Sequence, residues 1–379
     1  MTRRLRVGIF AGGKSAEHEV SVASAEAVLA SIDRETYEPY LVYIDRQGRW
    51  HLPSGPAPKL TGGSLAGLLG VDTPAEHTAH LSDESSLPAA VEDGALAPRA
   101  ALRSLAEAID IAFLVIHGPF GEDGTLQGFL ELAGIPYTGA GVLASALAMD
   151  KIVFKDLMRG HDLPVVDYTW FRRSDWTDAP DAVLADVAAH IGPRSVVKPA
   201  RLGSSLGMTV VHQPDELPAA ITEALRYDSK VLVEAYVAEA RELEVGVIGN
   251  DDPQAFEPGE VRSHGEWYDY AAKYTEGLAD VIPRAEVAPE LATRLRELAL
   301  AAYRAVDCAG FARVDFLVPP DGVYLSEMNT IPGFTATSMF PKQAEMAGID
   351  FRRLVDSLLR LALEREGPSD PVDREEEER

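Results

Sequence analysis

The pattern of apolar and polar positions predicts strands that alternate with helices near the amino end of the chain. Residues 6–11 form a short apolar run that ends at a Gly-Gly pair, and a helical pattern follows at 24–32. Further apolar runs at 40–44 and 109–116 predict two more strands, and the second is typical of a buried parallel strand. Strands that alternate with helices in this way predict an α/β fold with a doubly wound sheet.

The rest of the chain continues the alternation, apart from residues 52–100, which are rich in Pro, Gly, Ser and His and show no clear period. We interpret that segment as an irregular insertion. Helices are predicted at 142–158, 184–191, 215–226 and 289–306, and strands at 195–198, 208–212, 231–237, 242–248, 311–318 and 323–329. The elements predict domains at 1–140, 141–236 and 237–365, followed by a disordered acidic tail at 366–379.

The charge of the chain narrows the classes of partner. Its 379 residues include 35 Lys and Arg against 60 Asp and Glu, which gives a formal net charge of −25. A surface this acidic disfavours nucleic acids and anionic membranes, because both are polyanions. Hydrophobic residues make up 46% of the chain, but no run approaches the roughly 20 apolar residues of a membrane span. We therefore expect a globular protein that acts on small molecules.

The single cysteine and the first residues of the chain indicate in which cellular compartment we expect the protein. Cys308 leaves no intrachain disulfide to form, which fits a reducing environment. We interpret it as a small core residue rather than a nucleophile, since no histidine is adjacent in the sequence. The first residues are basic but lack a long apolar stretch and a cleavage site, so no signal peptide is predicted. These features predict a cytoplasmic location.

A phosphate-loop pattern near the amino end is better explained as a strand and a turn. Residues 8–15, GIFAGGKS, match G-x-x-x-x-G-K-[ST], but Ile9 and Phe10 would then occupy the loop. Ending the strand at Phe10 makes Gly12-Gly13 the turn, and the following Ser and Glu residues suit a helix start. Glu17 then either helps to cap that helix or points from the crevice at a cationic ligand group.

Two glycine-rich segments follow predicted strands. Residues 117–124, HGPFGEDG, come after the buried strand at 109–116, and residues 201–207, RLGSSLG, come after a strand that ends at Lys198. Glycines permit close backbone approach, and backbone N–H groups with a nearby lysine can bind phosphate oxygens. The alternatives are a plain turn for the first segment and a flexible hairpin for the second. Lys151 lies on a predicted helix, where a lysine is usually just solvated.

The densest group of polar residues lies near the carboxyl end. Arg313 and Asp315 share one face of a predicted strand, and Glu327 and Asn329 share one face of the next. Asp315 faces Glu327 if the two strands form a hairpin whose connection is residues 319–323. Such oxygen ligands suit Mg²⁺ or Mn²⁺ with a nucleotide phosphate. The alternative is a solvated polar face held by ion pairs.

The segment YDYAAKY, residues 268–274, lies in a polar stretch with several glycines around it. A loop of this length is usually functional or disordered. Because its aromatic residues give it something with which to dock, we predict a lid over the site. The alternative is an exposed disordered loop.

Together these segments resemble the D-alanine–D-alanine ligases of the ATP-grasp superfamily. The resemblance runs from about Val7 to Leu361 and is carried by AGGKSAEHEVS, HGPFGEDGTLQG, VVKPARLGSSLGM, YDYAAKY, ARVDF and SEMNTIPGFTATSMFP, in this order. It implies a three-domain ATP-grasp fold with an N-terminal parallel-sheet domain. It also implies ATP-dependent ligation of two D-alanines through D-alanyl phosphate, for peptidoglycan precursors.

The resemblance further implies a role for particular residues of this chain. ATP would contact Lys151, Lys198, Ser205, Glu234, Ala235, Tyr236, Val237, Glu242 and Lys273. Two Mg²⁺ ions, with Mn²⁺ as a substitute, would bind Asp315, Glu327 and Asn329. Catalysis would involve Glu17, Ser204, Tyr274, Arg313 and Gly333, and the two D-alanines would also contact His117, Ser338 and Met339. We expect a homodimer.

Other functions stay open at this level. A D-Ala–D-Ser or D-Ala–D-Lac ligase, or another carboxylate–amine ligase, would use the same motifs, although Tyr274 favours D-alanine as the second substrate. A non-catalytic nucleotide-binding regulator is the alternative from another class. That alternative predicts a lost metal ligand, whereas Asp315, Glu327 and Asn329 are all present.

Overall fold

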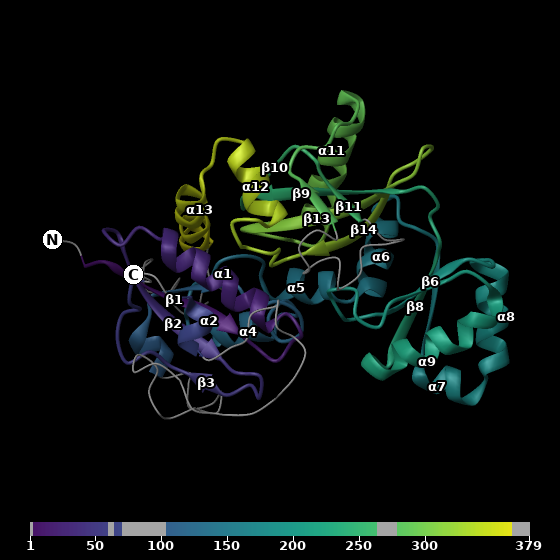
Figure 1. Cartoon of the computed structure of the whole chain (residues 1–379), viewed down its shortest axis with the longest axis horizontal. Helices are drawn as coiled ribbons and strands as arrows, with labels where there is room; N and C mark the ends of the chain where they lie inside the picture. Colours follow the sequence, from purple (N-terminus) through teal and green to yellow (C-terminus); the bar gives the residue numbers. More distant parts are fainter. Residues whose placement is uncertain (1–2, 60–63, 70–103, 264–278, 366–379) are drawn as a thin grey trace, which may run out of the picture.

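The structure is a computed structural model that describes residues 3–59, 64–69, 104–263 and 279–365. Within these residues the strands form three sheets, one for each third of the chain (Figure 1). The view in Figure 1 places the first sheet at the lower left, the second at the lower right and the third above and between them. None of the described helices is long and apolar enough to cross a bilayer.

The first sheet has the order β3-β2-β1-β4, and its three longer strands are parallel. They are β1 (Leu5–Gly12), β2 (Tyr37–Ile44) and β4 (Ile111–Leu114), while β3 (Trp50–His51) pairs antiparallel at the edge. The strands predicted near the amino end are therefore confirmed. Because β1 continues to Gly12, Ile9 and Phe10 are strand residues and the phosphate-loop pattern forms no loop. The turn lies at Gly12-Gly13, where both φ angles are positive, at 90° and 99°.

Two helices flank the carboxyl ends of these strands. Helix α1 (His18–Ser31) follows β1, and α4 (Thr125–Leu132) follows the segment after β4. A Cβ on Gly12 would lie 2.2 Å from the Ile44 carbonyl oxygen, so only glycine fits at the end of β1. Of the irregular insertion, the structure describes 52–59 and 64–69, with the short helix α2 (Leu65–Leu69).

The second sheet is antiparallel, with the order β5-β8-β6-β7. Its strands are β5 (Tyr168–Arg172), β6 (Ser195–Pro199), β7 (Thr209–Val211) and β8 (Lys230–Ala235). Strand β5 was not predicted, and the three others were. Helices α7 (Arg173–Asp178), α8 (Pro180–His190) and α9 (Leu217–Tyr227) pack beside the sheet, and the 3-10 turn η2 (Pro214–Glu216) precedes α9.

The third sheet is also antiparallel, with the order β12-β11-β9-β13-β14 and β10 paired to β9. The strands are β9 (Arg241–Ile248), β10 (Gln254–Ala255), β11 (Gly259–Ser263), β12 (Ala279–Ile282), β13 (Phe311–Val318) and β14 (Tyr324–Asn329). Helix α11 (Pro289–Ala305) packs its buried leucines on this sheet. The predicted connection of residues 319–323 between β13 and β14 is confirmed.

The single helix predicted at 142–158 is wrong, because the chain breaks at Asp150. Helix α5 (Val142–Met149) ends there and α6 (Lys151–Gly160) begins. Asp150 is extended, and its carboxylate accepts the N–H groups of Ile152 and Val153. An apolar period cannot reveal this break, since Asp150 caps α6 without interrupting the spacing of the apolar residues.

Two groups of helices pack in the core of a sheet that is distant from them in the sequence. Helices α5 and α6 bury Ala144, Ala148 and Phe154 in the core of the third sheet, although they fall in the second predicted domain. Helices α12 (Met339–Met346) and α13 (Phe351–Glu364) end the described chain, and α13 lies beside α1 (Figure 1). The predicted domain boundaries stay predictions.

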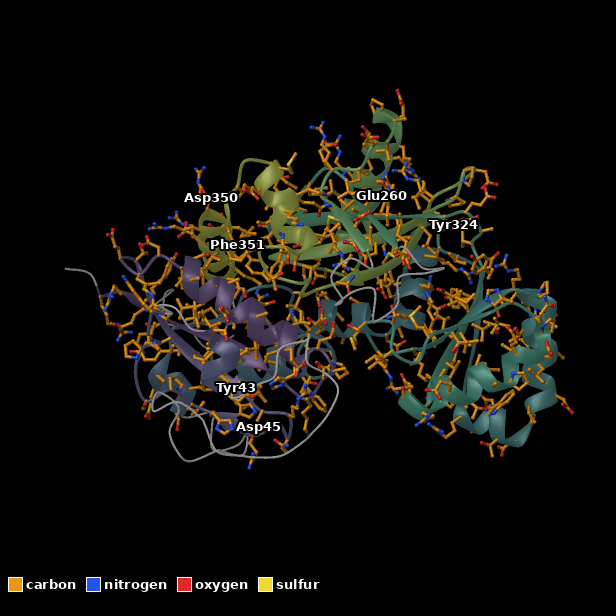
Figure 2. All side chains as sticks on the ribbon, in the orientation of Figure 1. Tyr43, Asp45, Glu260, Tyr324, Asp350 and Phe351 are labelled. Carbon is orange, nitrogen blue, oxygen red and sulfur yellow. The ribbon has the colours of Figure 1, made fainter. Side chains whose placement is uncertain are left out.

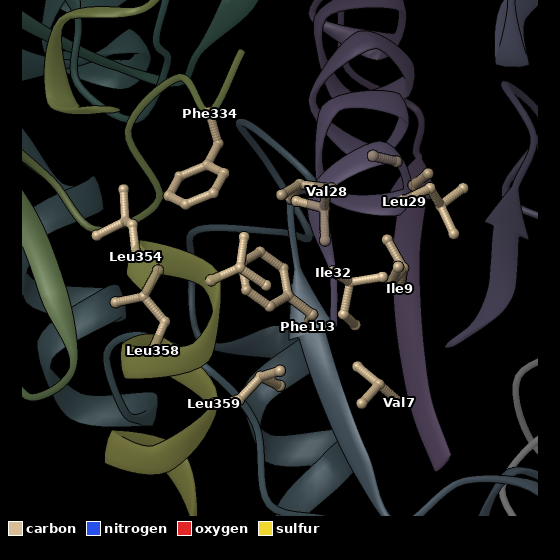
Figure 3. Packing of buried hydrophobic residues seen from close by; sticks show 14 of the residues in the cluster. Val7, Ile9, Val28, Leu29, Ile32, Phe113, Phe334, Leu354, Leu358 and Leu359 are labelled. Atoms are coloured by element: carbon tan, nitrogen blue, oxygen red, sulfur yellow. The ribbon is translucent and has the colours of Figure 1, made fainter. Parts of the chain in front are cut away.

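Helix α13 packs on the first sheet. Leu354, Leu358 and Leu359 share one apolar core with Val7 of β1 and with Phe113 of β4 (Figure 3). Ion pairs and hydrogen bonds reinforce the contact, including Tyr37 Oη to Asp356 Oδ1 at 2.7 Å and Arg352 to Asp33 at 2.7 Å. The labelled Asp350 and Phe351 mark the start of α13 in Figure 2. The carboxyl end of the chain therefore ties the third sheet to the first.

Candidate active site

A cleft of about 330 Å³ opens between the second and third sheets. It is lined from β6, the loop after it, the end of β8, and strands β9, β13 and β14. The predicted residues that line it are Lys151, Lys198, Ser204, Ser205, Glu234, Ala235, Tyr236, Val237, Glu242, Arg313, Asp315 and Glu327. The fold therefore brings most of the predicted nucleotide, metal and oxyanion residues to one place.

One buried carboxylate in the cleft binds two lysines. Glu234 on β8 is 2% exposed, and its oxygens lie 2.6 Å from Lys155 Nζ and 2.5 Å from Lys198 Nζ. Burial by itself raises the pKa of Glu234, but the two lysines outweigh it and lower that pKa to about 2. Burial likewise opposes the charge on Lys198, yet Glu234 raises the Lys198 pKa. For Lys155 burial prevails, and its pKa is lowered.

Lys151 connects three parts of the cleft. It is the first residue of α6, and its backbone N–H donates to Ala200 O at 2.9 Å. Its Nζ donates to Leu202 O at 3.0 Å and lies 2.9 Å from Glu327 Oε2 on β14. The interpretation of Lys151 as a merely solvated residue is wrong, because the break at Asp150 turns it into the cleft.

The Gly/Ser loop after β6 is the connection of an antiparallel hairpin with β7, and Asp228 anchors its first residue. Asp228 accepts the backbone N–H of Arg201 at 2.9 Å and also binds its guanidinium at 2.5 and 3.0 Å. Ser204 and Ser205 adopt positive φ angles of 52° and 58°. Non-glycine residues in this conformation cost roughly 1–2 kcal/mol and persist only where the surroundings hold them, as they do at binding sites.

The predicted register at the carboxyl end is confirmed. Asp315 of β13 pairs directly with Glu327 of β14, and Arg313 pairs with Asn329. A bulge follows Asp315, between it and Phe316. The side chains of Arg313, Asp315 and Asn329 are joined, with Arg313 Nε and Nη2 both 2.7 Å from Asp315 and Asn329 Nδ2 2.9 Å from it.

Glu244 extends this group across a third strand. On β9 it pairs with Asp315, it is 6% exposed, and it lies 3.2 Å from Arg313 Nε. Burial works against the charge of Arg313, but Asp315 and Glu244 raise its pKa well above the ordinary value. Among the described residues, no three His, Cys, Asp or Glu side chains come together closely enough to hold a metal ion. The two carboxylates and one amide oxygen of Asp315, Glu327 and Asn329 are nevertheless the hard donors that Mg²⁺ takes alongside water and phosphate.

The amino-terminal residues approach the cleft from the first sheet. Glu17 precedes α1 and makes no capping hydrogen bond through its side chain, so capping does not explain it. A Cβ placed on Gly118 would lie 3.1 Å from Glu17 Oε2, and one on Gly203 would lie 3.5 Å from it. Glu17 therefore sits between both glycine-rich loops. His117 is 3% exposed, and burial lowers its pKa although Glu17 opposes that effect.

Three further predicted residues follow β14 and do not line the cleft: Gly333, Ser338 and Met339. Ser338 and Met339 stand at the start of α12, where the helix dipole favours an anion. Ser338 Oγ accepts the Thr335 N–H at 3.2 Å. A Cβ on Gly333 would lie 3.0 Å from Ser338 Oγ, so this connection is tightly packed. Lys273 and Tyr274, with the predicted lid, lie outside the described residues.

Comparisons with known proteins identify the family of this chain. The family model described as the D-ala D-ala ligase N-terminus matches residues 6–140, and that of the C-terminus matches residues 157–360. The chain belongs to the D-alanine–D-alanine ligase family. The ligase family includes the D-alanine–D-alanine ligase of Deinococcus radiodurans, 44% identical over 95% of this chain and 98% of that protein. The one of Geobacillus thermodenitrificans is 39% identical over 96% of each.

Solved structures of the ligase family have the same fold. The VanG D-Ala:D-Ser ligase of Enterococcus faecalis matches with a TM-score of 0.78 at 31% identity, over 95% of this chain and 100% of that one. The D-alanine–D-alanine ligase of Coxiella burnetii matches with a TM-score of 0.75 at 30% identity, over 99% of each. The predicted three-domain ATP-grasp fold with an N-terminal parallel sheet is thus confirmed.

Three charged residues of this ligase-family site were not singled out in the sequence. Lys155 lies four residues after Lys151 and so shares its helix face, a spacing that could have marked it. Glu244 lies two residues after Glu242 on one strand, so both side chains share a face, and this spacing could have marked Glu244 as a site residue. Glu122, within HGPFGEDG, had no signal for its contact with Ile331, because that partner lies 209 positions away in the sequence.

Proposed function

We propose that this chain joins two D-alanines in an ATP-dependent reaction that forms D-alanyl-D-alanine for peptidoglycan precursors. The observation that carries the proposal is the direct pairing of Asp315 with Glu327 beside Lys151. This arrangement gathers hard oxygen donors and a cation in a cleft, as phosphoryl transfer from a nucleotide requires. Relatives named D-alanine–D-alanine ligase along the full length support the choice of substrate over D-serine or D-lactate.

ATP would bind in the cleft between the second and third sheets. Lys151 and Lys198 would hold its phosphates, and Ser205 and Lys273 would add contacts to them. The segment Glu234–Val237 would border the adenine, and Glu242 would bind the ribose. Divalent cations, two Mg²⁺ ions or Mn²⁺ in their place, would be held by Asp315, Glu327 and Asn329 and would neutralise phosphate charge.

The first step activates a carboxylate. A carboxylate oxygen of the first D-alanine attacks the γ-phosphorus, and ADP leaves with the electron pair of the broken P–O bond, which gives D-alanyl phosphate. Glu17 would bind the ammonium group of this substrate, with neutral His117 near it. Catalysis at this step is mainly positioning and charge neutralisation.

The second step forms the amide. The amine nitrogen of the second D-alanine attacks the acyl carbon, phosphate leaves, and the nitrogen loses a proton. Arg313 and the Gly333 N–H would stabilise the oxyanion, and one such donor is worth roughly 3 kcal/mol in comparable sites. Ser338 and the Met339 N–H, at the start of α12, would bind the second carboxylate.

The remaining roles concern water and assembly. We propose that Ser204, Tyr274 and Glu17 form a hydrogen-bonded triad that closes a lid, which would keep water from the acyl phosphate. A cytoplasmic homodimer is part of the proposal. The net charge of −25 supports the further proposal that the chain binds neither nucleic acid nor an anionic membrane. Light scattering of the purified chain tests the dimer.

The decisive experiment measures ADP release with D-alanine, D-serine, D-lactate and L-alanine, alone and in pairs. We expect D-alanine alone to support turnover, with the mass of D-alanyl-D-alanine in the product. Absence of turnover with D-alanine alone contradicts the proposal. A clear preference for a mixed pair would instead identify a ligase of the D-Ala–D-Ser or D-Ala–D-Lac kind.

A further inference from the structure

The backbone N–H and carbonyl of Ile331, which follows the third sheet, are both bound by side chains from the loop after β4 of the first sheet. The N–H of Ile331 donates to Glu122 Oε1 at 3.1 Å, and its carbonyl accepts from His117 Nδ1 at 2.9 Å. Ile331 follows β14, whereas His117 and Glu122 follow β4. The partners are separated by 209 and 214 positions in the chain, so only the tertiary fold brings them together.

Glu122 uses both of its oxygens for this purpose. Its Oε2 accepts the N–H of Gly118 at 2.6 Å, while Oε1 accepts that of Ile331. The carboxylate therefore ties the 117–122 loop to the segment that follows β14. A glutamine can accept only one of these N–H groups, because its NH₂ group would face the other donor.

The same clamp settles the state of His117. A carbonyl oxygen only accepts, so Nδ1 must carry the proton that binds Ile331 O. Burial lowers the His117 pKa and so favours the neutral ring, in which Nε2 keeps its lone pair. His117 Nε2 is buried and has no hydrogen-bond partner among the described residues. The charge of Glu17 acts on both His117 and Glu122. Burial and Glu17 raise the Glu122 pKa, whereas its two N–H donors and Arg313 lower it.

The clamped segment carries the groups assigned to the second chemical step. Gly333 lies two residues beyond Ile331, and Ser338 and Met339 begin the helix that the segment enters. Phe334, between them, is fully buried against Phe113 of the first sheet, so the segment has little freedom beside the clamp. The grip on Ile331 thus fixes the Gly333 N–H relative to Glu17.

We propose that Glu122 is a positioning residue of the ligase reaction, which holds the Gly333 segment in register with the loop that carries His117. The inference rests on the proposed function, since it assigns Glu122 to the D-alanine side of that site. Glu122 does not line the nucleotide cleft. Loss of the clamp should therefore lower kcat and weaken D-alanine binding while leaving ATP binding unchanged.

The chain offers a matched control in the same loop. Asp123 accepts the N–H groups of Phe120 at 2.8 Å and Thr125 at 3.0 Å, so its hydrogen bonds stay within the loop and the start of α4. We would compare Glu122→Gln and Glu122→Asp with Asp123→Asn in the wild-type background. The shorter Asp side chain cannot reach both N–H groups, and it serves as a second variant if Glu122→Gln fails to fold.

Two readouts separate positioning from mere stability. In the ADP-release assay we expect Glu122→Gln to lower kcat at least tenfold with KM for ATP within twofold of wild type, and Asp123→Asn to stay within twofold for both. By hydrogen exchange we expect the backbone N–H groups of Ile331, Gly333 and Phe334 to exchange at least tenfold faster in the Glu122 variants alone. Circular dichroism confirms that each variant is folded.

The outcomes are distinct. Wild-type kcat or wild-type exchange at 331–334 in the Glu122 variants overturns the inference, and so does a parallel rise in KM for ATP. A wild-type enzyme that releases no ADP with D-alanine contradicts the proposed function instead. In that case the positioning role falls with it, and the exchange experiment still decides whether Glu122 holds the segment.

Discussion

Lys151 Nζ lies 2.9 Å from Glu327 Oε2, so a residue proposed for phosphate binding neutralises one proposed for metal binding. Lys198, also proposed for phosphate binding, lies 2.5 Å from Glu234 Oε2, which belongs to the segment proposed to border the adenine. These pairs let a chain with a net charge of −25 keep a compact cationic group at an acidic cleft. When ATP and Mg²⁺ bind, a phosphate would take the place of Glu327 as the partner of Lys151, and the metal ion would take the place of Lys151 as the partner of Glu327. The net charge of the cleft would then stay balanced.

The pairing predicts the effect of removing the Glu327 charge. Glu327→Gln should abolish Mg·ATP turnover, because the variant loses a metal ligand and leaves Lys151 without its partner. ADP release measures the loss, and circular dichroism should show a native spectrum. Glu223→Gln, on the exposed face of α9 beside Arg226, is the control and should retain full activity. Wild-type rates in Glu327→Gln would refute the metal assignment.

A second prediction concerns acid stability, through Glu260 on β11, which is labelled in Figure 2. Arg241 and Arg262 bind this 4%-exposed carboxylate at 2.8 and 2.7 Å, and the Arg241 hydrogen bond leads in lowering its pKa to about 2. A pKa lowered on folding stabilises the native state above the unfolded pKa of about 4.5, and that contribution disappears as the pH falls towards 2.

Glu260→Gln should accordingly lower the free energy of unfolding at pH 7, on the order of 2 kcal/mol for lost charged hydrogen bonds. The difference from wild type should shrink as the pH falls from 4.5. Urea denaturation at several pH values measures it. Glu290→Gln, exposed on α11, should change the unfolding free energy by less than about 0.5 kcal/mol. A difference that does not vary with pH would contradict the assignment.

A third prediction tests the contact of α13 with the first sheet. Leu358 is 1% exposed in the shared core, whereas Leu363 on the same helix is 45% exposed. Leu358→Ala should cost about 2–5 kcal/mol through lost burial and the cavity left behind. Leu363→Ala should cost less than about 0.5 kcal/mol. Equal effects of the two variants on urea denaturation would mean that α13 does not pack where Figure 3 shows it.

The fourth prediction concerns the turn after β1. Gly12 has a φ of 90°, and a Cβ there would meet Ile44 O at 2.2 Å, whereas Gly134 has a φ of 63° and open space around it. Gly134→Ala should cost roughly 1–2 kcal/mol, the strain of a left-handed residue alone. Gly12→Ala adds a backbone clash and should reduce the yield of folded protein severely. Similar melting temperatures for both variants would show that the contact with Ile44 is not close.

The sequence by itself determined the features that depend on local geometry. Alternation along two strands and a connection of residues 319–323 predicted that Asp315 lies opposite Glu327, and the structure has this pairing, although a bulge after Asp315 that the sequence did not predict contributes to the register. Steric limits made Gly12-Gly13 a turn rather than part of a phosphate loop. Strand periodicity and turn chemistry act over a few residues, so they can be read without knowing where the rest of the chain goes.

Only the tertiary structure decided the contacts between distant segments. It placed Glu234 between Lys155 and Lys198, set Lys151 beside Glu327, and brought Glu122 to Ile331. It also sent α13 back to the first sheet. Burial and charge pairing depend on which segments pack together, and no spacing along the chain encodes the distance between residues that lie 200 positions apart.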